Sequence, residues 1–214
     1  MQNIKSIGLK NRSDLHLARK AWHLVGVLSI AYFHTIISRP TALILLGFAT
    51  AFVYSIDLIR QVSPKLNDFV VHAFRGIMRQ GEVDKLSGNT YLLAGVFTIV
   101  FLFPPVIVQL TLLFLAFADP IASLIGVKYG RDKIWGNKSL QGFLAALFVC
   151  TILTLIYCSY HNLMSNRIFA VSLSAGLVGA LSELIQIGKL DDNLTLPIIS
   201  ASGLYGLFLI FGGF

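Results

Sequence analysis

The sequence has little charge for its length. Only 13% of its 214 residues are Asp, Glu, Lys or Arg, whereas 56% are hydrophobic. A soluble domain of this size does not need so much apolar surface, and several apolar runs approach the roughly 20 residues that cross a bilayer. We therefore predict an all-α fold, a polytopic membrane helical bundle in which residues 1–214 form a single integral membrane domain.

Cysteine is also scarce, and several familiar motifs are missing. The two cysteines, Cys150 and Cys158, lie eight residues apart in one apolar run. On a helix they would be about 12 Å apart, too far to form a disulfide with each other, so we interpret them as core thiols. No GxSxG, HExxH, CxxC or GxGxxG pattern occurs. This absence argues against familiar hydrolases, zinc proteases and dinucleotide-binding domains.

Acidic residues are fewer than basic ones, 10 against 17, for a net charge of +7. The positive-inside rule explains this balance, so we expect no nucleic-acid partner. With the N-terminus inside, every Lys and Arg except Arg39 and Arg167 lies on the cytoplasmic side, and so do all the acids. We expect an integral membrane protein with a cytoplasmic N-terminus, in the cell inner membrane if the source is bacterial.

Apolar runs predict seven transmembrane helices, of which the third is short and ends at Pro104-Pro105. Residues 1–21 are polar and basic, unlike a cleaved signal peptide, and form a predicted cytoplasmic segment. Between the second and third spans, Leu66, Val70, Phe74 and Ile77 recur at helical spacing, which predicts an amphipathic helix on the membrane surface. The predicted spans cover approximately residues 22–38, 41–59, 90–103, 106–127, 142–160, 168–188 and 196–212.

The stretch 116–143 carries the strongest functional signal. Asp119 lies inside an apolar run, and a charge at membrane depth costs several kcal/mol and is usually functional. On a helix, Asp119 shares a face with Ala122, Ser123 and Gly126, so it should point into the bundle. Pro120 would free a backbone carbonyl one turn earlier, which needs a partner. The alternative is a structural Asp paired with a basic residue on a neighbouring helix.

A basic loop comes directly after this run. It contains two glycines, Gly130 and Gly136, and ends at Ser139, which is placed to cap the next helix. Cations and backbone N–H groups at a helix N-terminus bind phosphates, and glycines allow close approach. We therefore predict a nucleotide-phosphate site here, although a loop that only sets topology would account for the charge. The predicted contributors are Lys128, Arg131, Lys138, Ser139, Gly126 and Gly130.

Further acids come near the end of the chain. Glu183 lies inside the sixth predicted span, and Asp191, Asp192 and Asn193 come within the next ten residues. Hard oxygen ligands close to phosphates suit Mg²⁺. The Asp-Asp-Asn turn could equally be an ordinary helix start. Our predicted metal set is Asp119, Asp191, Asp192 and Asn193, which Glu183 could also join.

A polar face opens the first span. His16, Arg19, Lys20 and His23 recur at helical spacing at its mouth. Snorkelling lipid anchors beside Trp22 are one interpretation, and a face that binds an anionic ligand is the other. The spacing alone leaves both open.

Five segments, in order, resemble one known family, the membrane lipid-alcohol kinases that include dolichol kinase, phytol kinase and CTP-dependent diacylglycerol kinase. The resemblance extends over most of the chain and implies phosphate transfer from CTP, or another nucleoside triphosphate, to a lipid hydroxyl with Mg²⁺. Essential family positions fall on Arg19, Lys20, Asp119 and Gly126, while Ala118 departs from a common Gly. The segments are RKAWHLVG (19–26), MRQGEVDKLSGNTY (78–91), ADPIASLIGVKYG (118–130), NKSLQG (137–142) and SELIQIGKLDDNLTLP (182–197).

These observations predict a lipid kinase at the cytoplasmic face, with Asp119 and the later acids around Mg²⁺. Arg19 and Lys20 would close the far side of the phosphates. Either Glu183 or Asp119 could act as general base, and His23 and Glu82, within the matching segments, are further candidates. The expected partners are CTP, a lipid alcohol and membrane lipids. The alternatives are a CTP:lipid-phosphate cytidylyltransferase and a small anion or metal transporter.

Overall fold

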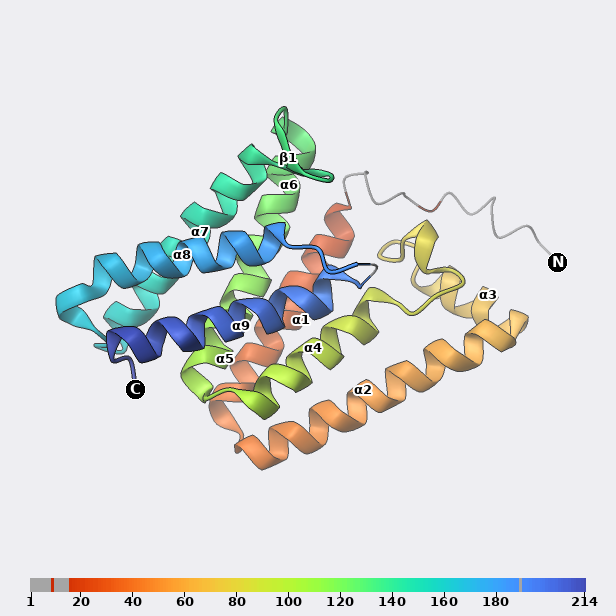
Figure 1. Ribbon diagram of the computed structural model, residues 1–214. Helices are drawn as coiled ribbons and strands as arrows, with labels where there is room; N and C mark the ends of the chain where they lie inside the picture. The colour runs from red at the N-terminus through yellow and green to blue at the C-terminus, as the bar shows by residue number, and fades with distance from the viewer. Residues whose placement is uncertain (1–8, 10–15, 189) are drawn as a thin grey trace.

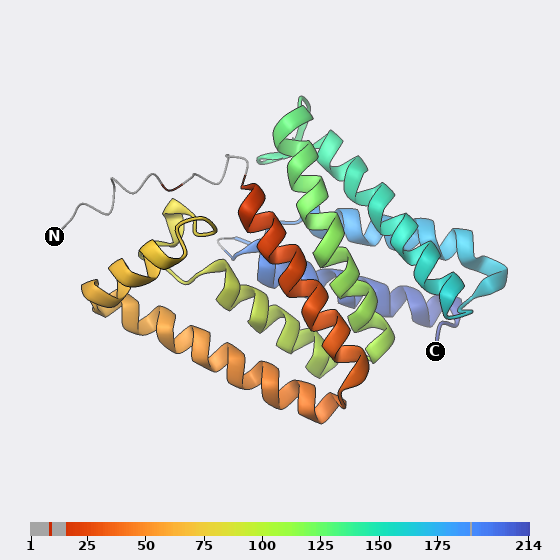
Figure 2. The same cartoon turned by 180° about the vertical axis from the view of Figure 1, so that it is seen from behind.

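The computed structural model describes residues 9, 16–188 and 190–214, and shows an all-helical bundle with one small β-hairpin (Figures 1 and 2). Most of the predicted cytoplasmic segment 1–21 lies outside the described residues. The elements are α1 (Leu17–Ile36), α2 (Arg39–Val62), α3 (Pro64–Ala73), η2 (Gln80–Glu82), α4 (Gly88–Leu102), α5 (Pro105–Leu113), η3 (Phe114–Ala118), α6 (Asp119–Tyr129), β1 (Lys133–Trp135), β2 (Lys138–Ser139), α7 (Leu140–Tyr160), η4 (Ser165–Arg167), α8 (Ile168–Leu184) and α9 (Asp192–Phe211).

Short polar residues and prolines start these helices. Ser38, Ser87 and Ser139 each accept a hydrogen bond from a backbone N–H in the first turn of α2, α4 and α7. Asp191 does the same for α9. Such caps satisfy N–H groups that have no partner within the helix, which fixes where each helix begins.

Within the described residues, five helical segments are long and apolar enough to cross a membrane, and α4 is a shorter apolar helix. The α1 helix is also 20 residues long. The fourth predicted span is one continuous helical segment, Pro105–Tyr129, because a π-helical turn, η3, joins α5 to α6 through Pro120. The sixth predicted span ends sooner than expected, at Leu184. The five segments are Arg39–Val62, Pro105–Tyr129, Leu140–Tyr160, Ser165–Leu184 and Asp192–Phe211.

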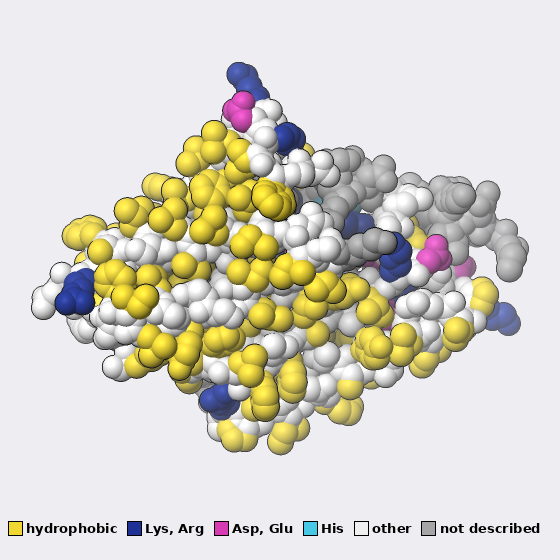
Figure 3. All heavy atoms as spheres, viewed as in Figure 1, with side chains coloured by type: hydrophobic (Ala, Val, Ile, Leu, Met, Phe, Trp, Pro, Cys, Tyr) yellow, Lys and Arg dark blue, Asp and Glu magenta, His cyan; other side chains and the backbone are white. Residues whose placement is uncertain are grey.

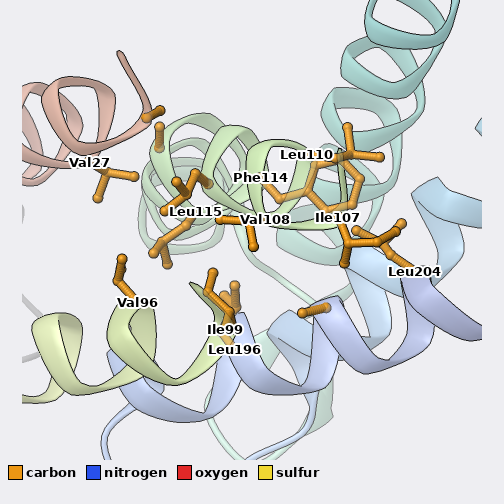
Figure 4. Close-up of a cluster of buried hydrophobic side chains, with 14 of the residues drawn as sticks. Val27, Val96, Ile99, Ile107, Val108, Leu110, Phe114, Leu115, Leu196 and Leu204 are labelled. Carbon is orange, nitrogen blue, oxygen red and sulfur yellow. The ribbon is translucent and has the colours of Figure 1, made fainter. Parts of the chain in front are cut away.

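The core lies where α1, α4 and α9 surround α5 and η3 (Figure 4). Ile107, Leu110, Leu115 and Leu204 are completely buried there. Large apolar side chains also cover much of the outer surface, as Figure 3 shows on one face. That distribution is expected when the solvent around the helices is lipid, and it supports the predicted membrane bundle.

Two local features differ from the sequence analysis. The surface helix α3 ends at Ala73, so Phe74 and Ile77 come after it, and its buried residues are Asn67 and Val71. The basic loop 128–139 contains an antiparallel hairpin, β1–β2, which we did not predict. Gly136, with φ +53, forms its turn, so this glycine serves the backbone conformation of the hairpin.

One end of the bundle gathers the polar elements. The starts of α1, α4, α7 and α9 lie at this end, together with the ends of α2, α6 and α8 (Figures 1 and 2). The hairpin and α3 lie there as well. The turn between α7 and α8 lies at the opposite end. The chain therefore brings distant segments together at a single end of the membrane helices.

Candidate active site

A pocket of about 520 Å³ opens at this polar end, between α1, α6, α7, α8, the hairpin and the start of α9. Most of the residues singled out in the sequence line it, although they are up to 174 positions apart. The predicted residues on its wall are Arg19, Lys20, His23, Asp119, Gly126, Gly130, Lys138, Ser139, Glu183, Asp191, Asp192 and Asn193.

Three predicted residues lie elsewhere. Lys128 and Arg131 line a separate pocket with Tyr129, Gly130 and Gln141, and Lys128 Nζ lies 5.1 Å from the centre of the Tyr129 ring. Glu82 is buried behind Arg19. Of the six predicted phosphate contributors, Lys138, Ser139, Gly126 and Gly130 therefore line the pocket of about 520 Å³, whereas Lys128 and Arg131 do not.

Lys138 is held between two acids. Its Nζ lies 2.6 Å from Glu183 Oε1 and 3.4 Å from Asp192 Oδ2. Burial lowers the pKa of Lys138, but the charges of Glu183 and Asp192 outweigh burial and hold this pKa above its usual range. Glu183 is 8% exposed, and within the described chain its Oε2 has no hydrogen-bond partner. The single positive charge of Lys138 thus faces two carboxylates, those of Glu183 and Asp192.

Asp119 enters the pocket directly after the π-helical turn. Its carboxylate is 24% exposed, and Oδ2 lies 3.7 Å from Nε2 of His23. Lys20 Nζ donates to the carbonyl of the next residue, Pro120, at 3.1 Å. Two members of the polar face of α1, His23 and Lys20, therefore contact the segment that carries Asp119. Spacing alone had left open whether this face anchors the helix in lipid or binds an anionic ligand.

Arg19 is fixed from behind. Its guanidinium contacts both oxygens of Glu82, at 2.9 and 2.8 Å, and also donates to the Ile77 carbonyl. Glu82 in turn accepts from the backbone N–H of Arg79 at 3.1 Å. The Glu82 carboxylate therefore determines where Arg19 lies on the pocket wall.

Sequence reasoning missed the buried residues that hold this loop. Arg60 is 1% exposed and donates to Asp57, to Asn67 and to the carbonyls of Glu82, Val83 and Lys85. Asp57 also accepts from Ser87 N and Thr90 Oγ1 at 2.7 and 2.6 Å. A charged pair three residues apart at the end of an apolar span was the available signal, because such pairs are costly to bury without partners.

Small residues let α6 and α7 approach each other beside the pocket. A Cβ atom on Gly130 would overlap the Gly126 carbonyl oxygen and the Ser139 side chain. One on Gly142 would lie 3.0 Å from the Ala122 carbonyl. The face of α6 that carries Ala122 and Gly126 is therefore a close packing surface, and it brings the capped start of α7 to the pocket.

The acids at the start of α9 also have structural contacts. Asp191 accepts from the Asn193 N–H at 3.0 Å, and Asn193 Nδ2 donates to the Gly88 carbonyl at 3.3 Å. The helix-start interpretation of this turn is thus realised at Asp191. Asp192 faces Lys138 instead, which leaves Asp192 and Asp119 as the predicted metal donors nearest to the ion-pair cluster.

Comparison with known proteins identifies relatives over most of the chain. The sequence is 31% identical to CTP-dependent diacylglycerol kinase 1 of Schizosaccharomyces pombe, over 88% of this chain and 92% of that protein. It is 27% identical to the Saccharomyces cerevisiae protein of the same name, over 86% of this chain and 71% of that one. An uncharacterized Rickettsia prowazekii protein is 30% identical, over 86% and 91%.

No family model and no solved structure matches the chain. The relatives nevertheless agree with the resemblance that the five segments indicated. With a 31% identical kinase aligned along almost its whole length, and a pocket that unites the predicted residues, the chain belongs to the family of CTP-dependent lipid kinases that includes these diacylglycerol kinases.

Proposed function

We propose that this protein transfers the terminal phosphate of CTP to the hydroxyl of diacylglycerol, at the cytoplasmic end of its helical bundle. The curated relatives are named for this activity. The observation that carries the proposal is the pocket itself, in which Asp119, Glu183, Asp192 and Lys138 meet at one end of membrane helices. A lipid hydroxyl at the membrane surface can reach this end of the bundle, so we infer that donor and acceptor meet there.

The capped start of α7 is the proposed phosphate-binding element. Lys138 precedes it, Ser139 caps it by accepting from the Gly142 N–H at 3.2 Å, and both line the pocket. A lysine beside the positive N-terminal end of a helix dipole attracts phosphate oxygens. Arg19 and Lys20 supply positive charge from the facing wall, on α1.

Magnesium is the proposed cofactor, and the residues present fit it. Asp119 and Asp192 offer hard carboxylate oxygens, and the unpartnered Oε2 of Glu183 leaves local negative charge to balance. Among the described residues, no group of three His, Cys, Asp or Glu could hold a metal alone. Mg²⁺ usually binds one or two carboxylates plus substrate phosphates and water, so it would join with CTP and neutralise the transferring phosphate.

Glu183 is the proposed general base. Its Oε2 is buried, faces no hydrogen-bond donor within the described chain, and belongs to a residue on the pocket wall. Lys138, at 2.6 Å from the other oxygen, favours the ionised carboxylate that could accept the proton of the lipid hydroxyl. Asp119 then serves the metal, which divides the two roles that the sequence left open.

Product analysis with labelled CTP tests this function. Purified protein in lipid nanodiscs would receive γ-labelled or α-labelled CTP with diacylglycerol, a polyprenol or phytol, and ATP would be the alternative donor. We expect γ-label in phosphorylated diacylglycerol and release of CDP. Transfer of α-label with release of pyrophosphate would show a cytidylyltransferase, and preference for a polyprenol or phytol would reject diacylglycerol as the acceptor.

A further inference from the structure

The helix that carries Asp119 has an unusual hydrogen-bond register. The Asp119 N–H donates to the Phe114 carbonyl, five residues back, at the end of the π-helical turn η3. The next donor in this register would be residue 120, but Pro120 has no N–H. The carbonyl of Leu115 therefore lacks a backbone donor from Pro120. In an ordinary α-helix, Pro120 would instead leave the carbonyl of Ala116 without a donor.

His23 reaches that carbonyl from α1. Its Nε2 lies 3.0 Å from the Leu115 oxygen, and its side chain is only 12% exposed. Leu115 itself is completely buried, so water cannot easily replace this donor. Because a carbonyl oxygen only accepts, Nε2 must carry the proton in this contact. A buried carbonyl without a donor would be costly, particularly in a membrane helix.

We propose that His23 is a positioning residue, which holds the π-helical turn through the Leu115 carbonyl and thereby aims Asp119 into the pocket. One extra residue in a helical turn rotates the rest of the helix by roughly 100° relative to an uninterrupted α-helix. The direction of Asp119 thus depends on this turn. Lys20, bonded to the Pro120 carbonyl at 3.1 Å, supports the segment on the other side of Asp119. The inference rests on the proposed function, in which Asp119 acts.

Two substitutions at residue 23 separate positioning from other roles. His23→Leu removes the donor, while His23→Gln keeps an N–H donor without an imidazole. We expect His23→Leu to lower kcat for CTP-dependent phosphorylation about tenfold or more, since small misplacements of a site residue have such effects, with KM for CTP within about twofold. His23→Gln should recover most of that loss.

The matched background is Pro120→Ala, which restores an N–H at residue 120. In the π register this N–H serves the Leu115 carbonyl, and in an α register the Asp119 N–H does. In either case the Leu115 carbonyl gains a donor within its own helix, so the hydrogen bond from His23 is no longer needed to satisfy it. The loss of thermal stability caused by His23→Leu should therefore fall to less than about half in Pro120→Ala.

The outcomes are distinct. Equal loss of Tm from His23→Leu in both backgrounds would overturn the proposal, because His23 would then act on something other than the carbonyl freed by Pro120. A kcat of His23→Gln as low as that of His23→Leu would also overturn it, since the imidazole itself would be needed. Unchanged kcat with a lowered Tm would make His23 merely structural. A wild-type protein without kinase activity would instead reject the proposed function, and the Tm comparison would still stand.

Discussion

At the scale of single residues, several side chains at the pocket contribute both to the stability of the fold and to the proposed binding of substrate. Lys138 neutralises Glu183, which is almost fully buried, and also faces the space proposed for phosphates. Removing a lysine from such a pair leaves an uncompensated carboxylate, so a single substitution changes two properties at once. A second substitution is needed to separate them.

We predict that Lys138→Ala raises the KM for CTP about tenfold or more, because a charge-assisted contact to phosphate is lost. It should also lower stability by roughly 1–3 kcal/mol through the abandoned Glu183. Combining Lys138→Met with Glu183→Gln should restore stability without restoring nucleotide affinity, as measured by thermal unfolding and equilibrium CTP binding.

Arg131→Ala is the matched control for this prediction. Arg131 lies in the same basic loop as Lys138 but lines the separate pocket with Lys128. Its removal should therefore leave CTP affinity unchanged and alter stability by no more than about 0.5 kcal/mol. If Arg131→Ala and Lys138→Ala weaken CTP binding equally, the phosphates do not lie where we propose, beside Lys138 and the start of α7.

The residues that the sequence identified have a common physical signature. Asp119 and Glu183 are charges inside apolar helices, which is costly enough to indicate a site without any structure. The contact between His23 and Leu115 could not be predicted, because it depends on a π register that hydrophobic periodicity does not encode. The separation of Arg131 from Lys138 depends on the hairpin, whose Gly136-Asn137 turn was visible but was interpreted as part of a phosphate loop.

At the scale of elements, the segment between α3 and α4 has little regular structure, and the buried side chain of Arg60 makes three hydrogen bonds to its backbone. The same segment presents Glu82 to Arg19. The end of α2 thereby determines the position of a residue on the pocket wall. Polar periodicity in this segment could not reveal that role, because the partners of Arg60 are mainly backbone atoms.

We predict that Arg60→Lys lowers the stability of the protein by about 3–5 kcal/mol, since one ammonium cannot replace a guanidinium with five acceptors and leaves buried groups unpaired. Thermal unfolding in one detergent would measure it. Arg75→Lys, an exposed position on the same segment, is the control and should change stability by less than about 0.5 kcal/mol. Equal stability of the two variants would contradict the anchoring role of Arg60.

At the scale of the whole molecule, helix order and the gathering of acids at one end could be predicted from hydropathy and charge. Apolar runs locate the helices because each must cross a fixed thickness of lipid. They do not locate helix ends well, as α8 and α9 show, because caps such as Asp191 determine them. The helix face that Asp119 shares with Ala122 and Gly126 could be predicted from spacing, but its packing partner Gly142 on α7 could not.

Topology gives the prediction for the whole bundle. In a background with Cys150→Ala and Cys158→Ala, cysteines at Lys133 in the hairpin and at His161 in the α7–α8 turn should react with an impermeant reagent from opposite sides of a sealed membrane. Lys133→Cys should be the cytoplasmic one, since basic loops remain inside. Reaction of both from the same side would contradict the arrangement in which α7 crosses the bilayer.

The most direct test of the proposed site is Asp119→Asn. The variant keeps the size of the side chain but removes the charge assigned to magnesium, and a neutral amide is cheaper to bury. Single-turnover phosphorylation and thermal unfolding would be measured on one purified preparation of each protein. We predict a fall in rate of about a hundredfold or more, no recovery with added lipid substrate, and an unchanged or higher Tm. A destabilised variant that still turns over at the wild-type rate would contradict the placement of the reaction at Asp119.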